Sequence, residues 1–287
     1  MPDVENQAYT PMQFSIAAAD DETDNLAGEY KIVNISVFLA DANSNTISDK
    51  FVHQSFTSIT SGIQNCKSVN LPLDPTIIPR KDVYVIANFA DNAALQAIST
   101  VDDIKRLKTP QITNTQTLDT IIGLPMYGES RNVNLSIATA AAPAQITLIR
   151  ACAKLRITLT FPDASWLGTN SNFVIENAAP YTYFVKNDTA NIAQSAFVNY
   201  QPINFTAVSA QQFVGIAYVY EASVSPRLHI FTTIDGARHN YTASSNFPLP
   251  VRNYLYDIDV QILKSAQTVK VRMKKHTTAA DDRYSKN

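Results

Sequence analysis

Short stretches in which apolar and polar residues alternate recur along the chain and are separated by polar turns. A period of two places every second side chain on the same face, which is typical of half-buried β-strands. Such strands are predicted over residues 12–16, 30–39, 51–57, 68–73, 133–137, 173–178, 203–208, 213–220, 228–234 and 254–263. Residues 83–89 are almost all apolar, which predicts a strand buried on both faces.

Some segments depart from this pattern. Apolar residues recur at three-residue spacing within 92–108, which predicts one or two short helices: Leu95, Ile98, Val101, Ile104 and Leu107. Residues 127–130 are predicted to form a turn, and the alanine-rich segment 138–144 is the predicted linker between two domains. The apolar-rich run 146–160 is too long for a typical strand and is expected to bridge these domains.

The composition limits the classes of function. Apolar residues make up 45% of the 287 residues and charged residues 17%, so the chain can build two packed cores. The formal net charge is −2 and no basic face stands out, which argues against nucleic acid as a partner. No stretch approaches the ~20 apolar residues that span a membrane. The polar, acidic N-terminus has no signal peptide, and we expect a targeting segment to have been removed.

The residues that usually carry chemistry are scattered. The histidines lie at no recognised metal-ligand spacing, and neither nucleotide-binding nor nucleophile motifs occur. The adjacent carboxylates at 102–103 and 281–282 would diverge in a strand instead of facing each other across a cleft. We therefore expect no enzymatic activity, no catalytic residue, no metal and no cofactor. Cys152 is predicted to be a small buried core residue, and the sequence leaves open whether it pairs with Cys66.

Several structural motifs follow one another in a recognisable order. An acidic residue precedes the strand at 30–38, and the later motifs are V-Y-V-x-A-N at 83–88, a helical stretch at 101–107, P-M-x-G-E at 125–129, R-x-x-A-K-L at 150–155 and an aromatic strand at 253–258. In order and spacing, from residue 29 to about 263, they resemble the fimbrillin-like pilins, the subunits of type V pili in Bacteroidales.

This resemblance implies an all-β fold of two transthyretin-like antiparallel β-sandwich domains in series, 1–145 and 146–287, with the short helices in the first. It implies a structural or accessory subunit of a cell-surface pilus (fimbrium) that contributes to adhesion. Its partners would be other pilus subunits and host or bacterial surface ligands. The precursor would be a lipoprotein, associated with the outer membrane through a lipid anchor.

The resemblance also implies assembly by strand exchange after a protease removes the N-terminal strand. Met12, Phe14 and Ile16 alternate and are predicted to fill core pockets of the first domain as this removable strand. Val269, Val271 and Met273 also alternate and are the candidate donor strand that would replace them in a neighbouring subunit. The acidic segment 19–29 is predicted to be a mobile loop in which the protease cuts.

The sequence departs from the family in one respect. Maturation in the family commonly cuts after an arginine in the loop that follows the first strand, whereas this chain has no arginine before Arg80. Either a different protease acts between about residues 17 and 29, or the first strand is retained, as would suit a terminal or anchoring subunit. The alternative function is a surface protein that binds carbohydrate or host molecules without polymerising, with Trp166, Tyr181 and Tyr183 as candidate sugar-stacking residues.

Overall fold

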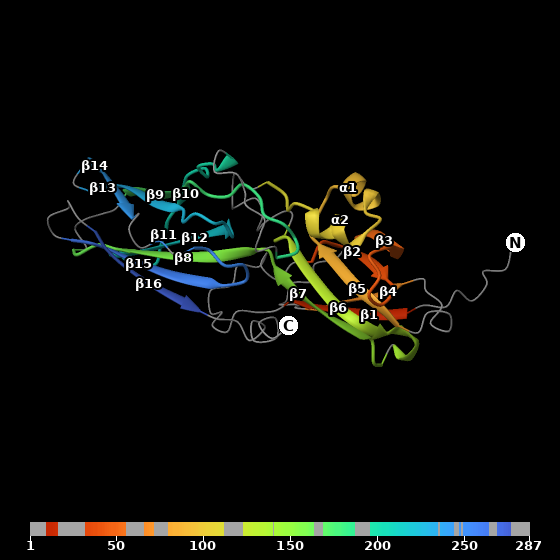
Figure 1. Cartoon of the computed structure of the whole chain (residues 1–287). Helices are drawn as coiled ribbons and strands as arrows, with labels where there is room; N and C mark the ends of the chain where they lie inside the picture. The colour runs from red at the N-terminus through yellow and green to blue at the C-terminus, as the bar shows by residue number, and fades with distance from the viewer. Residues whose placement is uncertain are drawn as a thin grey trace, which may run out of the picture.

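Two lobes of β-sheet lie along one long axis in the computed structural model (Figure 1). It describes residues 10–16, 32–55, 66–71, 80–111, 123–139, 141–163, 169–186, 196–234, 236–243, 247, 249–263 and 269–276. Strands dominate and the α-helices are short, which confirms the all-β class, whereas the transthyretin-like topology stays a prediction. Among these residues, no helix has the length and apolar character needed to cross a membrane.

The first lobe is built on a seven-stranded sheet with the strand order β3-β2-β5-β6-β7-β1-β4. Its strands are β1 (Thr10–Ile16), β2 (Asn34–Ala40), β3 (Ile47–Ser55), β4 (Cys66–Leu71), β5 (Arg80–Ala87), β6 (Met126–Asn134) and β7 (Ala144–Arg150). Helices α1 (Asn92–Ala97) and α2 (Val101–Arg106) cover one face of β2 and β5, and the short 3-10 helix η2 (Leu135–Ile137) follows β6 (Figure 1). The helices predicted within 92–108 are therefore confirmed.

The sheet turns a corner between β6 and β7 and so folds into two layers. These strands pair through Met126–Arg150 and Tyr127–Ile149 and then separate. A Cβ atom on Gly128 would lie 2.6 Å from the carbonyl oxygen of Thr147, so only glycine lets β7 cross so closely. The prediction of a turn over 127–130 is wrong, because these residues lie within β6 and the glycine serves this close approach.

Apolar side chains fill both sides of the central strands of the first lobe. Ile35, Val37 and Leu39 of β2 face the core between the two layers, while Phe38 faces the helices. β5 is likewise buried on both faces from its second residue onward, as its continuous apolar pattern predicted. The helices are held at their N-termini by side-chain caps, since Asp91 accepts a hydrogen bond from the Ala94 amide and Thr100 forms a capping box with Asp103.

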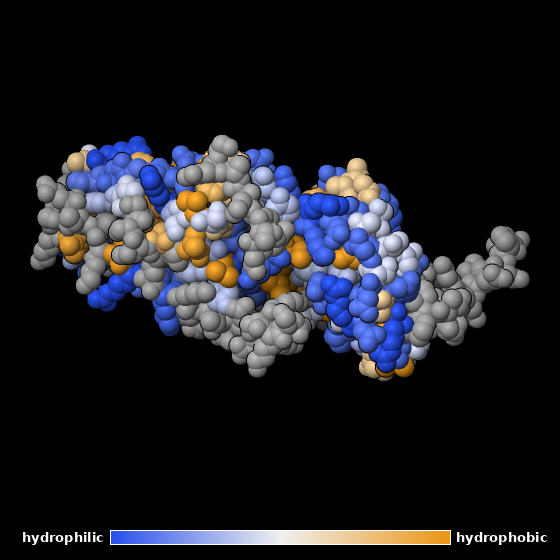
Figure 2. Space-filling model, viewed as in Figure 1, coloured by the Kyte–Doolittle hydropathy of each residue, from blue (hydrophilic) through white to orange (hydrophobic). Residues whose placement is uncertain are grey.

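A polar network continues this helix-side face beyond the helices, where Figure 2 shows mostly hydrophilic residues. Arg131 Nη1 lies 3.0 Å from Asp82 Oδ2, and its guanidinium stacks 4.8 Å above the ring of Tyr84. Burial alone would raise the pKa of Asp82. Hydrogen bonds from the Asn132 amide and from Arg131 outweigh burial and lower this pKa below its ordinary value.

The second lobe is a sandwich of two sheets with the orders β10-β9-β13-β14 and β11-β12-β8-β15-β16. Its strands are β8 (Cys152–Thr160), β9 (Thr169–Glu176), β10 (Ile203–Asn204), β11 (Thr206–Ala207), β12 (Gln212–Tyr220), β13 (Arg227–Ile234), β14 (Ala237–Ala243), β15 (Leu255–Ile262) and β16 (Val269–His276). The sheets approach closely at Gly215 of β12, where a Cβ would come within 2.4 Å of the Phe173 ring on β9. Glycine therefore lets this ring fill the core.

The chain passes from the first lobe to the second at Ala151, between β7 and β8. Segment 138–144 joins η2 to β7 within the first lobe, and one hydrophobic cluster continues through both lobes. The division into domains 1–145 and 146–287 stays a prediction.

A second connection between the lobes runs through two short segments, 107–110 and 181–184. Thr109 and Thr182 exchange backbone and side-chain hydrogen bonds, and Phe184 packs edge-to-face on Phe89 beneath the helices. Buried Arg252 donates to the carbonyl oxygens of Tyr183 and Phe184 at 2.8 and 2.6 Å and pairs with Glu221. Arg252 therefore holds segment 181–184 in position, and this segment connects the second lobe to the first.

Candidate functional site

Strand β1 lies inside a sheet although it is the first strand of the chain. It pairs in parallel with β7 on one side and antiparallel with β4 on the other. Residues 17–31, which separate β1 from the rest of the first lobe, lie outside the described residues, and so does the predicted cleavage loop 19–29. β1 thus occupies a slot between two strands that follow it much later in the sequence.

Met12 anchors β1 in the core. Its side chain is 0% exposed and belongs to the hydrophobic cluster between the two layers. The register places it opposite Ala144 of β7 and Val69 of β4. Full burial of such a side chain stabilises by about 1.5–3 kcal/mol.

Phe14 and Ile16 continue the same face of β1 by backbone register, and their side chains lie outside what the structure describes. They pair with Ile146 and Leu148 of β7, both of which are buried in the core. Without β1, the edges of β7 and β4 and these apolar side chains would line an open groove.

The outward face of β1 is held weakly. Gln145 Nε2 donates to Gln13 Oε1 at 2.5 Å in an exposed pair, which contributes little in water. Pro11 has no amide hydrogen, so β1 offers one ladder hydrogen bond fewer than another seven-residue strand would. The strand is therefore held mainly by its inward side chains and its backbone ladders.

The candidate donor strand, β16, lies at the edge of the second lobe. It pairs antiparallel with β15 and is the last strand of its sheet. Val271 is half-buried against the core, and the side chains of Val269 and Met273 lie outside what the structure describes. The structure therefore keeps the candidate donor in its own lobe and does not bring it to β1.

Charged residues line the outward face of β16. Arg272 and Lys274 are exposed and stand opposite Asp259 and Asp257 in the register. Asp257 also accepts two hydrogen bonds from Arg156 of β8, at 2.5 and 2.8 Å. Because Asp257 already has this bidentate partner, its cross-strand attraction for Lys274 adds little.

The chain is similar in sequence to a known protein family. A family model described as the major fimbrial subunit protein (FimA) matches residues 10–180, which is more than half of the chain and begins at the first residue of β1. The chain belongs to this fimbrillin-like family. Membership supports a pilus-associated, structural role in cell adhesion at the cell surface. No curated protein sequence matches this fimbrillin-like chain.

Solved structures share the fold of the fimbrillin-like chain over nearly its whole length. A fimbrial assembly protein from Parabacteroides distasonis has 16% sequence identity and a TM-score of 0.56, covering 94% of this chain and 99% of its own. A candidate cell adhesion protein from Bacteroides eggerthii has 13% identity and a TM-score of 0.62, with coverages of 95% and 98%. Another such candidate, from Bacteroides ovatus, has 12% identity and a TM-score of 0.58, with coverages of 94% and 98%. At these identities the likeness concerns the fold alone.

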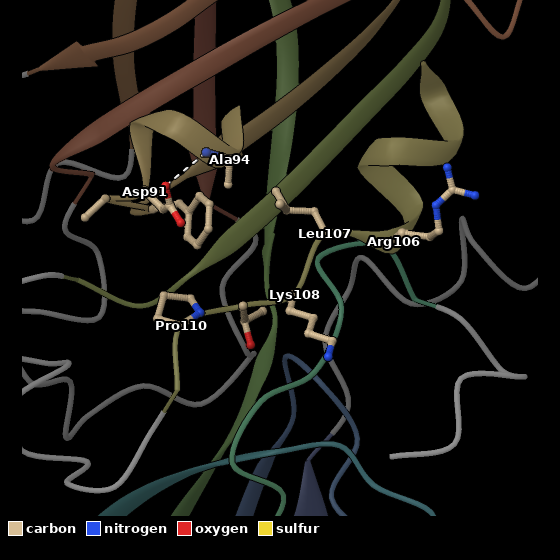
Figure 3. A pocket seen from close by; sticks show the side chains of 9 residues that line it. Asp91, Ala94, Arg106, Leu107, Lys108 and Pro110 are labelled. Atoms are coloured by element: carbon tan, nitrogen blue, oxygen red, sulfur yellow. Dashed lines mark hydrogen bonds between the residues drawn. The ribbon is translucent and has the colours of Figure 1, made fainter. Parts of the chain in front are cut away.

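A pocket of about 580 Å³ opens beside the helices of the fimbrillin-like chain (Figure 3). It is lined by Phe89, Ala90, Asp91, Ala94, Arg106, Leu107, Lys108, Thr109 and Pro110. Its charged groups already have partners: Asp91 caps α1, Arg106 pairs with Asp103 at 3.0 Å, and Lys108 lies 4.4 Å from the Tyr181 ring centroid. In Figure 3, Arg106 and Lys108 extend away from Asp91, so no constellation converges on the pocket.

The remaining sequence candidates do not form a site together. Tyr181 and Tyr183 lie in the connection between the lobes, where Lys108 contacts the former, and Trp166 lies outside the described residues. Cys152 is buried in β8 as a thiol, as predicted for a core residue, and the Cys66 side chain is not among those described. The walls of the groove, which β7 and β4 form, could not be predicted from the sequence, because only long-range strand pairing identifies them.

Proposed function

We propose that this chain is a structural or accessory subunit of a cell-surface pilus that assembles by strand exchange after its first strand has been removed by proteolysis. The observation that carries the proposal is the position of β1, between β7 and β4 and joined to β2 by the long segment 17–33. A strand in such a position can be cut free without interrupting any of the other strands that the structure describes in this lobe.

Loss of β1 would favour the binding of another strand in its place. Two strand edges would lose their partners, and exposed strand edges are templates for pairing with another chain. At the same time Ile146 and Leu148 would lose their cover. A strand that offers alternating apolar side chains restores both the ladders and the core, which is the physics of β-augmentation.

The candidate donor for that groove is β16 of another copy. Val269, Val271 and Met273 repeat the alternation of Met12, Phe14 and Ile16. As an edge strand, β16 leaves its own sheet by breaking its ladder with β15 alone. When β16 is inserted in the groove, its basic residues would point outward into solvent, where charged side chains remain hydrated.

Export as a lipoprotein, a lipid anchor in the outer membrane and contact with host or bacterial surface ligands complete the proposal. Since no arginine precedes Arg80, we propose that a protease of other specificity cuts between residues 17 and 29. Retention of β1 would instead give a terminal or anchoring subunit.

A cleavable variant tests the exchange. A recognition sequence for a site-specific protease is placed within residues 17–29, the protein is cut, and a peptide with the sequence of residues 266–276 is added. We expect the N-terminal fragment that carries β1 to stay bound after cutting and to be released by this peptide, but not by a control peptide with Val271→Asp. A fragment that leaves at once and yields a stable monomer would argue for the non-polymerising alternative. A fragment that neither peptide releases would contradict exchange with β16 and would indicate a retained first strand or another donor.

A further inference from the structure

The outward face of the sheet β10-β9-β13-β14 carries an aromatic residue that the core does not explain. Along β13, Leu228, Ile230 and Ile234 are buried in the core, whereas His229 and Phe231 point to the opposite face. Among the described residues, Phe231 is half-buried and belongs to neither hydrophobic cluster. The Phe231 ring therefore lies on the outer surface of the second lobe.

Asparagines flank this ring in a straight row across the sheet. The register pairs Asn204 of β10 with Asn172 of β9, Asn172 with Phe231, and Phe231 with Asn240 of β14. Neighbouring strands lie about 4.8 Å apart, so the row is roughly 14 Å long. Asparagine is depleted in strands because it fits a pleated surface poorly, so its recurrence along this row is unusual.

The amides of the row offer matched hydrogen-bonding groups. Each asparagine side chain carries two N–H donors and an oxygen that accepts, which is what a sugar hydroxyl, itself donor and acceptor, requires. Asn240 Oδ1 already contacts His229 Nε2, and Asn172 Nδ2 donates to the Asn170 carbonyl oxygen at 3.3 Å, so the remaining N–H groups of these amides are the ones offered to a ligand. The row is long enough for a short oligosaccharide. We call the surface formed by Asn204, Asn172, Phe231, Asn240, His229 and Arg238 the amide–aromatic face.

The charge on this face favours an acidic ligand. Arg227 and Arg238 are exposed, and the only carboxylate described on this face, Glu176, lies 2.9 Å from His229 Nδ1. Within the described part of the chain, Arg238 has no carboxylate partner; its guanidinium rests 5.2 Å from the centroid of Phe231. An exposed cation–π contact contributes about 0.5–1 kcal/mol, so a ligand can displace this guanidinium at little cost.

The ring is also held in place for binding. His229 stacks on Phe231 with centroids 4.6 Å apart and an interplanar angle of 28°. His229 itself is fixed by Glu176 on one ring nitrogen and by Asn240 on the other. Such pre-organisation reduces the entropy lost when a ligand binds. In Figure 2 the area where Figure 1 draws β13 and β14 is largely hydrophilic, as a glycan surface would be.

We propose that the amide–aromatic face binds an acidic oligosaccharide. A sugar ring packs on Phe231 where Arg238 now lies, and the displaced guanidinium pairs with a carboxylate or sulfate on the sugar. The hydroxyls bond to the amides of Asn172, Asn204 and Asn240. The proposal goes beyond assembly of the pilus, because the face lies in the second lobe and away from β1. Failure of strand exchange would leave it intact, and the reverse also holds.

The test uses the full chain and three polysaccharides of known charge: polygalacturonate, dextran sulfate and neutral dextran. Affinity is measured by calorimetry for the wild type and for two variants of exposed residues, Arg238→Gln and Asn204→Ala. Arg272→Gln on β16 is the charge-matched control. Because all three side chains are exposed, folding should survive, which thermal unfolding verifies.

We expect binding to one or both acidic polymers. Arg238→Gln should weaken it by about tenfold, as the loss of one charge-assisted bond implies, while Arg272→Gln changes it less than about twofold. Asn204→Ala should have an intermediate effect. Preference for polygalacturonate or for dextran sulfate would identify the acidic group. Equal losses in Arg238→Gln and Arg272→Gln would reveal unspecific charge attraction and overturn the proposal. Equal binding of dextran, or no binding to any of the three, would overturn it as well.

Discussion

Replacement of Met12 by alanine should loosen β1 while the rest of the chain stays folded. Met12 is 0% exposed, and truncation of a buried methionine to alanine costs about 2–5 kcal/mol because it leaves a cavity. Even the lower value would raise the fraction of molecules in which β1 has left its slot by about 30-fold. The cost falls on β1 because Met12 is its buried apolar side chain among those that the structure describes, beside buried Thr10, two backbone ladders and an exposed glutamine pair.

Hydrogen exchange followed by mass spectrometry measures this opening. In Met12→Ala, amides of β7 and β4 should exchange faster than in the wild type, whereas those of β8 and β12 should not change. Gln13→Ala is the matched control, since its side chain lies on the outward face of the same strand and should cost less than about 0.5 kcal/mol. Faster exchange in all strands alike would mean that β1 is not a separable element. An unchanged pattern in Met12→Ala would refute its role as the anchor.

Further substitutions test the fold around the groove, the lobe connection and the polar network. Gly128→Ala should lower the free energy of unfolding by several kcal/mol or prevent folding, because its Cβ would strike Thr147, whereas Gly236→Ala, strained only by its φ of 77°, should cost about 1 kcal/mol in urea unfolding. Arg252→Met should cost about 3–5 kcal/mol, since it leaves Glu221 and two carbonyl groups without their buried donor; a loss below about 1 kcal/mol would show that this connection between the lobes is unimportant. The folded-state pKa of Asp82 lies below its unfolded value of 3.8, so its contribution to stability is present above pH 3.8 and is lost as the pH falls through the folded value. The difference in urea midpoint between wild type and Asp82→Asn should therefore shrink on acidification below about pH 4, and a difference that grows would contradict this sign.

The periodicity of the sequence predicted the strands whose burial is regular. β5 could be recognised because nearly all its residues are apolar, and β1 because Met12, Phe14 and Ile16 alternate. β14 was missed because it is an edge strand in which Tyr241 alone is a buried large apolar residue. Residues 127–130 were misread as a turn because glycine signals both turns and close backbone approaches.

The functional surfaces depend on pairing that no local pattern contains. The alternation in β1 predicted a strand with one apolar face, yet its slot is made by β7 and β4, which lie far away in the sequence. The amide–aromatic face is still less visible, because Asn172, Asn204, Phe231 and Asn240 come from four strands and meet only through the register. Register between distant strands is set by the packing of the whole sandwich, which periodicity does not reveal.

The most direct test of β1 as a removable strand is the size of the particles formed when it is absent. Residues 1–28 are deleted, with and without residues 265–287, and molar mass is measured by light scattering after size-exclusion chromatography. We predict that the chain without residues 1–28 forms oligomers, and that further deletion of residues 265–287 abolishes them. A stable monomer after the first deletion would contradict the account of β1 as a plug, and equal assembly without residues 265–287 would exclude β16 as the donor.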